Sequence, residues 1–391
     1  MKQIVTLGLE NLIKNPPEHL KKQRLGLLSN PASVDGQFNH ASKLIQKKFP
    51  GQLKALFSPQ HGFYAEKQDN MIESNHSMEP ELNIPIYSLY SNTRIPTKKM
   101  FDKIDVLIID LQDVGTRVYT FIYTVSYCLE IAAKQKKQVL ILDRPNPIGG
   151  TQIEGNILSQ EYTSFVGRFP IPMRHGMTIA EISQFFNREF NLGCDLGIVP
   201  MSNWKRKMYW SDTELVWISP SPNLPTAHSC MVYPGQVIFE GTNISEGRGT
   251  ALPFEQFGAP FMDTKKIKLP ADDLIKGANL RPVNFEPTSG KWQSNVCKGF
   301  QIHITNREKF RPYLSSLILM QLIIKYHKNE FEFKNPPYEY EHEKMPMDII
   351  LGSKKLREKL INLENLSLLS NQWEQGLEKF KSLSGKYYLY E

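Results

Sequence analysis

The sequence predicts an α/β protein in which a parallel sheet is followed by a smaller α/β unit. Short blocks of branched apolar residues alternate with amphipathic stretches, and the blocks VLII (106–109) and VLIL (139–142) contain no polar residue. Such blocks are typical of strands that are buried on both faces of a parallel sheet. A proline-rich tract at 218–236 interrupts the alternation, which predicts a domain boundary. We therefore expect one domain over residues 1–228 and a second over residues 229–391.

In chain order, the apolar blocks predict strands at 25–29, 53–58, 106–111, 139–143 and 195–200. Apolar residues recur every three or four positions from 119 to 136, which predicts a helix. The basic run KQKK lies in its last turn, where positive charge interacts favourably with the helix macrodipole. A second helix begins in MTIAEISQFFNREF (177–190), where Thr178 has the N-cap position and Glu181 the capping-box spacing.

After the predicted boundary the pattern changes. GFQIHIT (299–305) predicts a strand, residues 312–327 and 353–362 predict helices, and WEQGLEKF (373–380) forms a final segment. The apolar stretch at 314–324 falls well short of the ~20 residues that cross a bilayer, so it predicts a buried helix.

Composition excludes several classes of function. The 47 Lys and Arg against 40 Asp and Glu give a net charge of +7 that is spread along the 391 residues, whereas a nucleic-acid binder concentrates its basic residues. The first fifteen residues lack the apolar core of a secretory signal, so we expect a cytoplasmic protein without a membrane partner. The four cysteines are far apart with no C-x-x-C pair, and no glycine-rich nucleotide motif occurs. We expect no disulfide, no metal and no cofactor.

Polar motifs follow three of the predicted strands: FSPQHGF (57–63), DLQDVGTRVYT (110–120) and LDRPNP (142–147). Ligands of open α/β sheets bind outside the carboxyl ends of the strands, so these loops predict one cleft. Asp110, Asp113 and Arg117 lie in the second loop, which ends at Tyr119. The alternative for Asp113 is structural, namely that it caps the following helix and pairs with Arg117.

The other candidate residues occur in four short segments. Asp143, Arg144 and Asn146 lie in a loop stiffened by two prolines, where a structural Asp–Arg turn is the alternative. His61 and His175 are candidates for acid–base or hydrogen-bonding roles, although a lone His is more often structural. The glycine-rich stretch 240–250 and the loop 65–74 offer the carboxylates that glycosidic hydrolysis needs in pairs, with an ion-paired turn as the alternative for the first. Their candidates are Glu240, Asn243, Glu246, Arg248, Glu66, Asp69 and Glu73.

These blocks, in this order, resemble the exo-β-N-acetylmuramidase family (NamZ-like) over nearly the full length. Further matching blocks are SNPASVD (29–35), IPIYSLY (84–90), RHGMTIAE (174–181), the segment 233–260 and CKGFQIHITNR (297–307). The resemblance implies a Rossmann-like N-terminal domain, a smaller C-terminal α/β domain and a cleft between them. It also implies release of N-acetylmuramic acid from the non-reducing end of peptidoglycan fragments.

One departure from the family bears on mechanism. Where the family typically reads PEHG, with Glu as candidate acid, this sequence has Gln60, which cannot exchange a proton at neutral pH. Our leading hypothesis is a glycoside hydrolase acting on a small saccharide or muropeptide, in which Glu66, Glu73, Asp110 and Glu240 are the candidate catalytic residues. Arg117, Arg144 or Arg248 would hold the lactyl carboxylate of the sugar.

Two other hypotheses remain open. The first is a carbohydrate- or muropeptide-binding protein that lost catalysis at Gln60. The second is a hydrolase of another bond, with a metal-assisted version using His61, Asp110 and His175, although these lack the spacing of metal ligands. The predicted binding residues are Gln60, His61, Asp113, Arg117, Tyr119, Asp143, Arg144, Asn146, His175, Asn243, Glu246 and Arg248.

Overall fold

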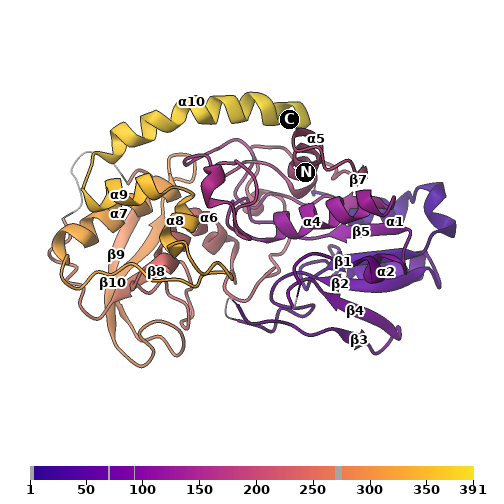
Figure 1. The fold of residues 1–391 in the computed structure, drawn as a ribbon, viewed down its shortest axis with the longest axis horizontal. Coiled ribbons are helices and arrows are strands. Elements are labelled where there is room, and N and C mark those ends of the chain that lie inside the picture. The colour runs from indigo at the N-terminus through magenta and orange to yellow at the C-terminus, as the bar shows by residue number, and fades with distance from the viewer. Residues whose placement is uncertain (1–3, 69–70, 92, 269–274) are drawn as a thin grey trace.

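The larger of two sheets in the computed structural model has seven strands in the order β3-β4-β2-β1-β5-β6-β7 (Figure 1). The structure describes residues 4–68, 71–91, 93–268 and 275–391. All neighbouring strands are parallel except the short edge strand β3. The strands are β1 (Leu25–Ser29), β2 (Leu53–Ser58), β3 (Ser77–Glu79), β4 (Ile84–Ser88), β5 (Val106–Asp110), β6 (Gln138–Leu142) and β7 (Asp195–Val199). The predicted α/β class and its five strands are confirmed.

The register of this sheet places the loops after β1, β2 and β5 together, at the carboxyl ends of the strands. Ser29 lies opposite Asp110, and Leu28 lies opposite Phe57, so the three strands end at nearly the same level. The strands β1 and β5 are buried at every position, which explains their continuous apolar blocks. The motifs that follow β2 and β5 are therefore presented on the same side of the sheet.

Helices join these strands and cover the sheet. The helix α5 begins as predicted, because the Thr178 hydroxyl accepts from the Glu181 N–H and the Glu181 carboxylate accepts from the Thr178 N–H at 3.0 Å. The helices of this part are α1 (Gly8–Lys14), α2 (Ala41–Lys48), α3 (Lys98–Phe101), α4 (Phe121–Lys134) and α5 (Ile179–Glu189), with short 3₁₀ turns at Glu18–Lys22, Gln160–Tyr162 and Trp210–Asp212.

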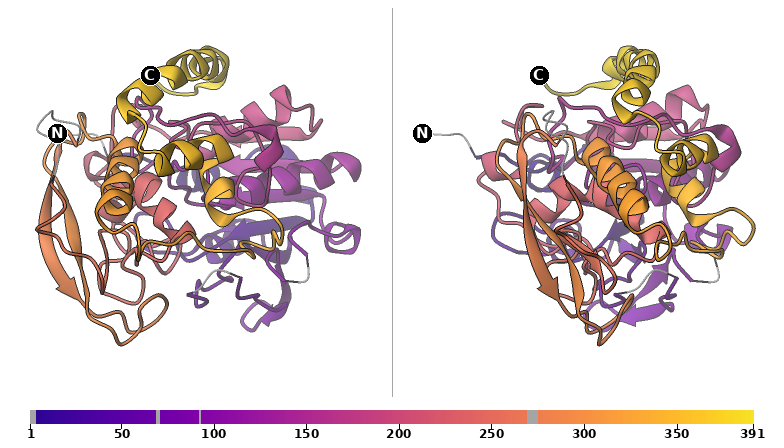
Figure 2. Two further views of the ribbon diagram at one scale, coloured as in Figure 1. Left: turned by 60° about the vertical axis from the view of Figure 1, so that its left-hand side comes forward. Right: turned by 90° about the vertical axis from the view of Figure 1, so that its left-hand side faces the viewer.

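The smaller sheet is antiparallel and has the order β8-β10-β9. Its strands are β8 (Gln256–Ala259), β9 (Ala278–Phe285) and β10 (Cys297–Ile304). Figure 2 shows the long β9–β10 ribbon at one end of the molecule, with α7 between it and the rest. The helices are α6 (Ala227–Gln236), α7 (Pro312–Tyr326), α8 (Pro346–Leu351), α9 (Lys354–Ile361) and α10 (Leu366–Ser384), with 3₁₀ turns at Val237–Gly241 and Gly385–Tyr387. The helix α7 is buried, as its apolar sequence predicted.

The tract at 218–236 is not irregular throughout, as the sequence suggested, because α6 occupies its second half despite Pro234. Thr226 caps the helix by accepting from the Ser229 N–H at 2.9 Å. Gly235 packs so closely on α7 that an added Cβ would lie 2.0 Å from the Pro312 carbonyl oxygen. Tertiary packing therefore stabilises a helix that local propensity disfavours.

The last segment of the chain returns to the larger sheet. The helix α10 runs across the top of the molecule in Figure 1, from the part that holds α7 and α9 toward α5. Beyond it, the Tyr390 hydroxyl donates to the Asp143 carboxylate at 2.6 Å and the Leu389 N–H donates to Glu181 at 2.9 Å. The division at residue 228 into two domains stays a prediction. No helix in the described ranges is both long and apolar enough to cross a membrane.

Candidate active site

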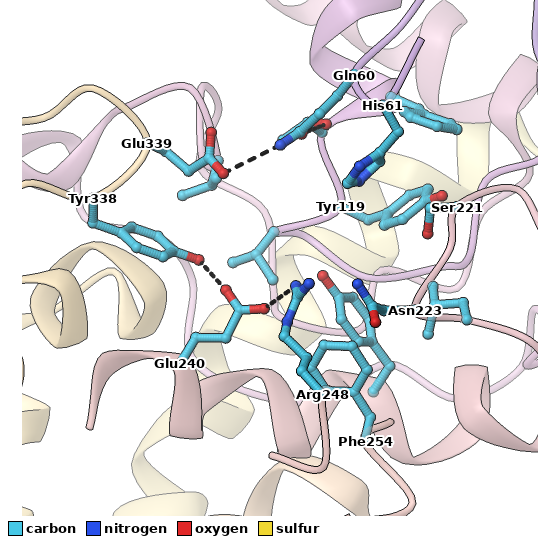
Figure 3. A pocket seen from close by; sticks show the side chains of 16 residues that line it. Gln60, His61, Tyr119, Ser221, Asn223, Glu240, Arg248, Phe254, Tyr338 and Glu339 are labelled. Carbon is cyan, nitrogen blue, oxygen red and sulfur yellow. Dashed lines mark hydrogen bonds and ion pairs between the residues drawn. The ribbon is translucent and has the colours of Figure 1, made fainter. Parts of the chain in front are cut away.

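A small hollow lies where loops of the larger sheet meet segments from the second half of the chain (Figure 3). Its volume is about 30 Å³, which is room for one or two water molecules. The polar residues that line it are Gln60, His61, Tyr119, Thr120, Ser221, Asn223, Tyr233, Glu240, Arg248, Tyr338 and Glu339. Five of the residues predicted from sequence are among them: Gln60, His61, Tyr119, Glu240 and Arg248.

The loop after β2 contributes Gln60 and His61. The backbone turns sharply here, with φ of 74° at His61 and 89° at Gly62, a conformation that is strained for a residue with a side chain. The Gln60 amide is held from both sides, because its oxygen accepts from the Thr120 hydroxyl at 2.7 Å and its Nε2 donates to Glu339 at 3.2 Å. Gln60 thus joins the start of α4 to a carboxyl group from the other half of the chain.

His61 is neutral at physiological pH. Burial lowers the pKa of its imidazole to about 4, and the nearby positive charge of Arg248 acts in the same direction. The neutral ring donates from Nδ1 to the Lys67 carbonyl oxygen at 2.6 Å. This bond selects the tautomer in which Nε2 is a hydrogen-bond acceptor.

Glu339 was not found by sequence reasoning. It lies between α7 and α8, is 4% exposed, and accepts from the Tyr90 hydroxyl at 2.6 Å as well as from Gln60. Burial raises the pKa of its carboxyl group, and the negative charge of Glu240 adds to the effect. The only signal in the sequence is the acidic run YEYEHE after two prolines, of which Glu339 alone is buried.

Glu240 forms the centre of a charged cluster. It comes from the 3₁₀ turn Val237–Gly241 and accepts from the Arg248 guanidinium at 2.6 Å and from the Tyr338 hydroxyl at 2.7 Å. Arg248 also lies 3.3 Å from Glu246, and Lys291 lies 2.7 Å from the other Glu246 oxygen. Burial alone would raise the pKa of Glu246, but the two cations lower it. The glycine-rich stretch therefore forms an ion-paired turn that also presents Glu240 to the hollow.

Most of the candidates after β5 and β6 lie outside the hollow, which corrects the prediction of a single cleft. Arg144 and Asp110 form a buried ion pair of 2.5 Å. Asp143 accepts from the Thr178 hydroxyl at 2.8 Å and the Ala180 N–H at 3.0 Å, so it caps α5, and burial raises its pKa to about 7. Asn146 is bonded to the Met177 carbonyl and the Ile148 N–H. These contacts favour the structural alternatives for the loop.

The Asp113–Arg117 pair does not form. Arg117 is fully buried and donates to four carbonyl oxygens, those of Asn156, Ile171, Ile350 and Leu351, so it ties the larger sheet's loops to α8. Asp113 accepts from the Gly115 N–H at 2.8 Å and faces His175 at 3.3 Å instead of capping α4. Because buried carbonyl oxygens need donors, the Arg117 guanidinium is used on the backbone and is not available to Asp113.

The remaining candidates also lie elsewhere. Glu66 is exposed, Glu73 pairs with Arg94 at 3.8 Å, and Asp69 lies outside the described residues. Asn243 donates to the Glu330 carbonyl and so braces a loop. The part of the chain that the structure describes contains no group of three His, Cys, Asp or Glu side chains placed to hold a metal.

Comparison with known proteins agrees with the resemblance of the motifs. The N-terminal and C-terminal models of exo-beta-N-acetylmuramidase NamZ match residues 25–228 and 231–390. The chain is 39% identical over 387 residues to the peptidoglycan beta-N-acetylmuramidase NamZ of Bacillus subtilis (strain 168), covering 99% of this chain and 91% of that protein. 

Two solved structures of DUF1343 family proteins from Bacteroides fragilis NCTC 9343 share the fold. The first has a TM-score of 0.87 and 32% identity and covers 99% of both chains. The second has a TM-score of 0.76 and 28% identity and covers 100% of this chain and 99% of the other. The chain therefore belongs to the exo-beta-N-acetylmuramidase NamZ family.

Proposed function

We propose that this protein is a glycoside hydrolase that releases N-acetylmuramic acid from the non-reducing end of peptidoglycan fragments. The observation that carries the proposal is the pair of buried carboxyl groups, Glu339 and Glu240, which line one hollow in different electrostatic surroundings. Glycosidic hydrolysis needs two such groups, one that gives a proton and one that is ionised. Membership of the family and the 39% identity to the Bacillus subtilis muramidase support the substrate class.

Glu339 is suited to be the general acid. Its raised pKa keeps a proton on the carboxyl group closer to neutral pH, as a group that protonates the leaving oxygen requires. The Tyr90 hydroxyl and the Gln60 amide fix its orientation from both oxygens. In this arrangement Gln60 positions the acid, and the absence of Glu at position 60 does not remove acid catalysis.

Glu240 is suited to be the ionised partner. The ion pair with Arg248 and the hydrogen bond from Tyr338 hold its carboxylate beside the same hollow. As a carboxylate it either activates a water molecule or attacks the anomeric carbon, while Glu339 gives its proton to the departing oxygen. The neutral His61 Nε2 offers an acceptor for a sugar hydroxyl.

Hydrolysis of two matched disaccharides tests the proposal. One carries N-acetylmuramic acid at the non-reducing end and the other carries N-acetylglucosamine there, with the Bacillus subtilis relative assayed in parallel. We expect release of N-acetylmuramic acid from the first only. Purified protein that turns over neither, while the relative is active, would refute the hydrolase.

A binding protein without catalysis is the second candidate, and Gln60 is the observation that favours it because an amide cannot replace a carboxylic acid. Calorimetry with the same disaccharides distinguishes the two candidates. Binding with no product after prolonged incubation would support the second. A loss of turnover of at least about 10²-fold in Glu240→Gln, with binding retained, would support the first.

A further inference from the structure

A second, larger hollow adjoins the candidate active site on the far side of Glu240. It shares Glu240, Arg248 and Tyr338 with the smaller hollow, so the two hollows adjoin at these side chains. Its volume is about 490 Å³, within the range of roughly 300–1,000 Å³ that is usual for ligand sites. The larger hollow has room for a whole sugar ring, whereas the 30 Å³ beside Glu339 has room only for single substituents of the ring.

The charges around the larger hollow are unbalanced. Three cationic side chains, Arg248, Lys291 and Lys334, line it against two carboxylates, Glu240 and Glu246, so one positive charge is in excess. An excess charge in a concave site attracts a ligand of opposite sign more strongly than the same charge on a flat surface would.

The positive charge that is not neutralised belongs to Lys334. Lys291 uses all three ammonium donors, on the carbonyls of Phe239 and Ile244 and on Glu246, at 2.6 to 2.8 Å. Arg248 pairs with both carboxylates. The Lys334 ammonium has no hydrogen bond or ion pair with any residue in the described part of the chain, and its side chain is exposed.

Lys334 is nevertheless held close to the candidate site. Its backbone N–H donates to the Gly241 carbonyl at 2.9 Å, directly after Glu240 in the chain. Burial lowers the pKa of Lys291, and the positive charge of Lys334 contributes in the same direction, which places the two ammonium groups within electrostatic reach. The side chain of Lys334 is therefore available to a ligand in the hollow, while its backbone is fixed.

We propose that the larger hollow is a subsite for a sugar residue that carries one carboxylate, and that Lys334 is the residue that selects for this charge. The inference rests on the proposed function, because it takes Glu240 to face the substrate. It adds the place where the acidic substituent binds and a residue that none of the sequence motifs contains. It also replaces the earlier candidates Arg117 and Arg144, whose guanidinium groups are buried and bonded elsewhere.

The test compares the dissociation constants of free N-acetylmuramic acid and its methyl ester, which lacks the negative charge and carries one more methyl group. Calorimetry is run on the wild type, on Lys334→Gln, and on Lys328→Gln as a control at an exposed lysine outside the hollow. We expect the wild type and the control to bind the acid about two- to fivefold more tightly than the ester, which is the upper part of the range for an exposed charge pair. In Lys334→Gln the preference should disappear, and in the wild type it should shrink at high salt.

The outcomes separate this inference from the proposed function. Equal binding of acid and ester by the wild type, an unchanged preference in Lys334→Gln, or no binding of either ligand would overturn the inference. A charge preference that depends on Lys334 in a protein without turnover would support the subsite and refute the hydrolase. Turnover of the muramic-acid disaccharide without a role for Lys334 would support the hydrolase and refute the subsite.

Discussion

Replacing Glu339 with Gln should remove most of the catalytic activity while leaving the fold intact. A general acid contributes about 10²- to 10⁴-fold to the rate, which corresponds to about 3 to 5 kcal/mol at 1.36 kcal/mol for each factor of ten. The expected loss of folding stability is smaller. The new amide keeps an oxygen for the Tyr90 hydroxyl, but its NH₂ group faces the NH₂ group of Gln60, so one hydrogen bond is lost at about 1 kcal/mol.

The assay uses two N-acetylmuramides that differ in their leaving groups. A nitrophenyl aglycone leaves readily without a proton, so Glu339→Gln should slow its release far less than the release of a sugar aglycone. The rate of the wild type should fall as the pH rises through the elevated pKa of Glu339, because the acid must be protonated, and the variant should lose this dependence.

Glu343→Gln provides the matched control. Glu343 is an exposed carboxylate in the same acidic run, and the substitution makes the same change of charge. If Glu339→Gln retains activity within about threefold of this control on the sugar aglycone, Glu339 is not the acid. An equal loss on both aglycones would show that the variant damages binding instead of proton transfer.

Three further predictions follow from the site and its supports. Gln60→Glu places a second carboxyl group beside Glu339, where the two share a proton, so the alkaline limb of the pH–rate profile should move upward, and an unchanged limb would contradict this. Arg117→Met removes four hydrogen bonds to buried carbonyl oxygens and leaves those of Asn156 and Ile350 without a donor, so it should lower the free energy of unfolding in urea by about 3 kcal/mol or more. His61 binds its proton in the unfolded chain near pH 6.5 but in the folded protein only near 4, so stability is full above pH 6.5 and falls by about 3 kcal/mol as the pH drops to 4. Its replacement by Asn should reduce this acid sensitivity, and equal sensitivity in both proteins would refute the assignment.

The elements that the sequence predicted well are those in which local and tertiary preferences agree. The buried strands of the larger sheet are continuous apolar blocks, and α5 has a capping box, so their positions could be assigned within a residue or two. The edge strand β9 was missed because it alternates polar residues and contains Pro282. Proline is tolerated there because β9 pairs with a strand on one side only.

The sequence predicted only part of the candidate site, because some residues that meet there are far apart in the chain. Gln60 and Glu240 stand in motifs at strand ends or among glycines, and the structure brings both to one hollow. Glu339 lies 279 residues after Gln60, and no local sequence pattern predicts that the two side chains are in contact. The positions of Asp110 and Asp143 at strand ends suggested catalytic and binding roles. A carboxylate at a strand end can equally pair with a guanidinium or cap a helix, and these two do so.

The contact between Tyr390 and Asp143 has a consequence for how the protein is made. Asp143 is a buried carboxylate at the end of β6, and one of its hydrogen bonds comes from a residue 247 positions later. A ribosome completes the strands of the larger sheet long before that hydroxyl emerges, so the nascent first half lacks one of the groups that hydrogen-bond this acid. The hydrogen bonding of Asp143 is therefore completed only when the segment around Tyr390 docks on the sheet, which is a late step in folding.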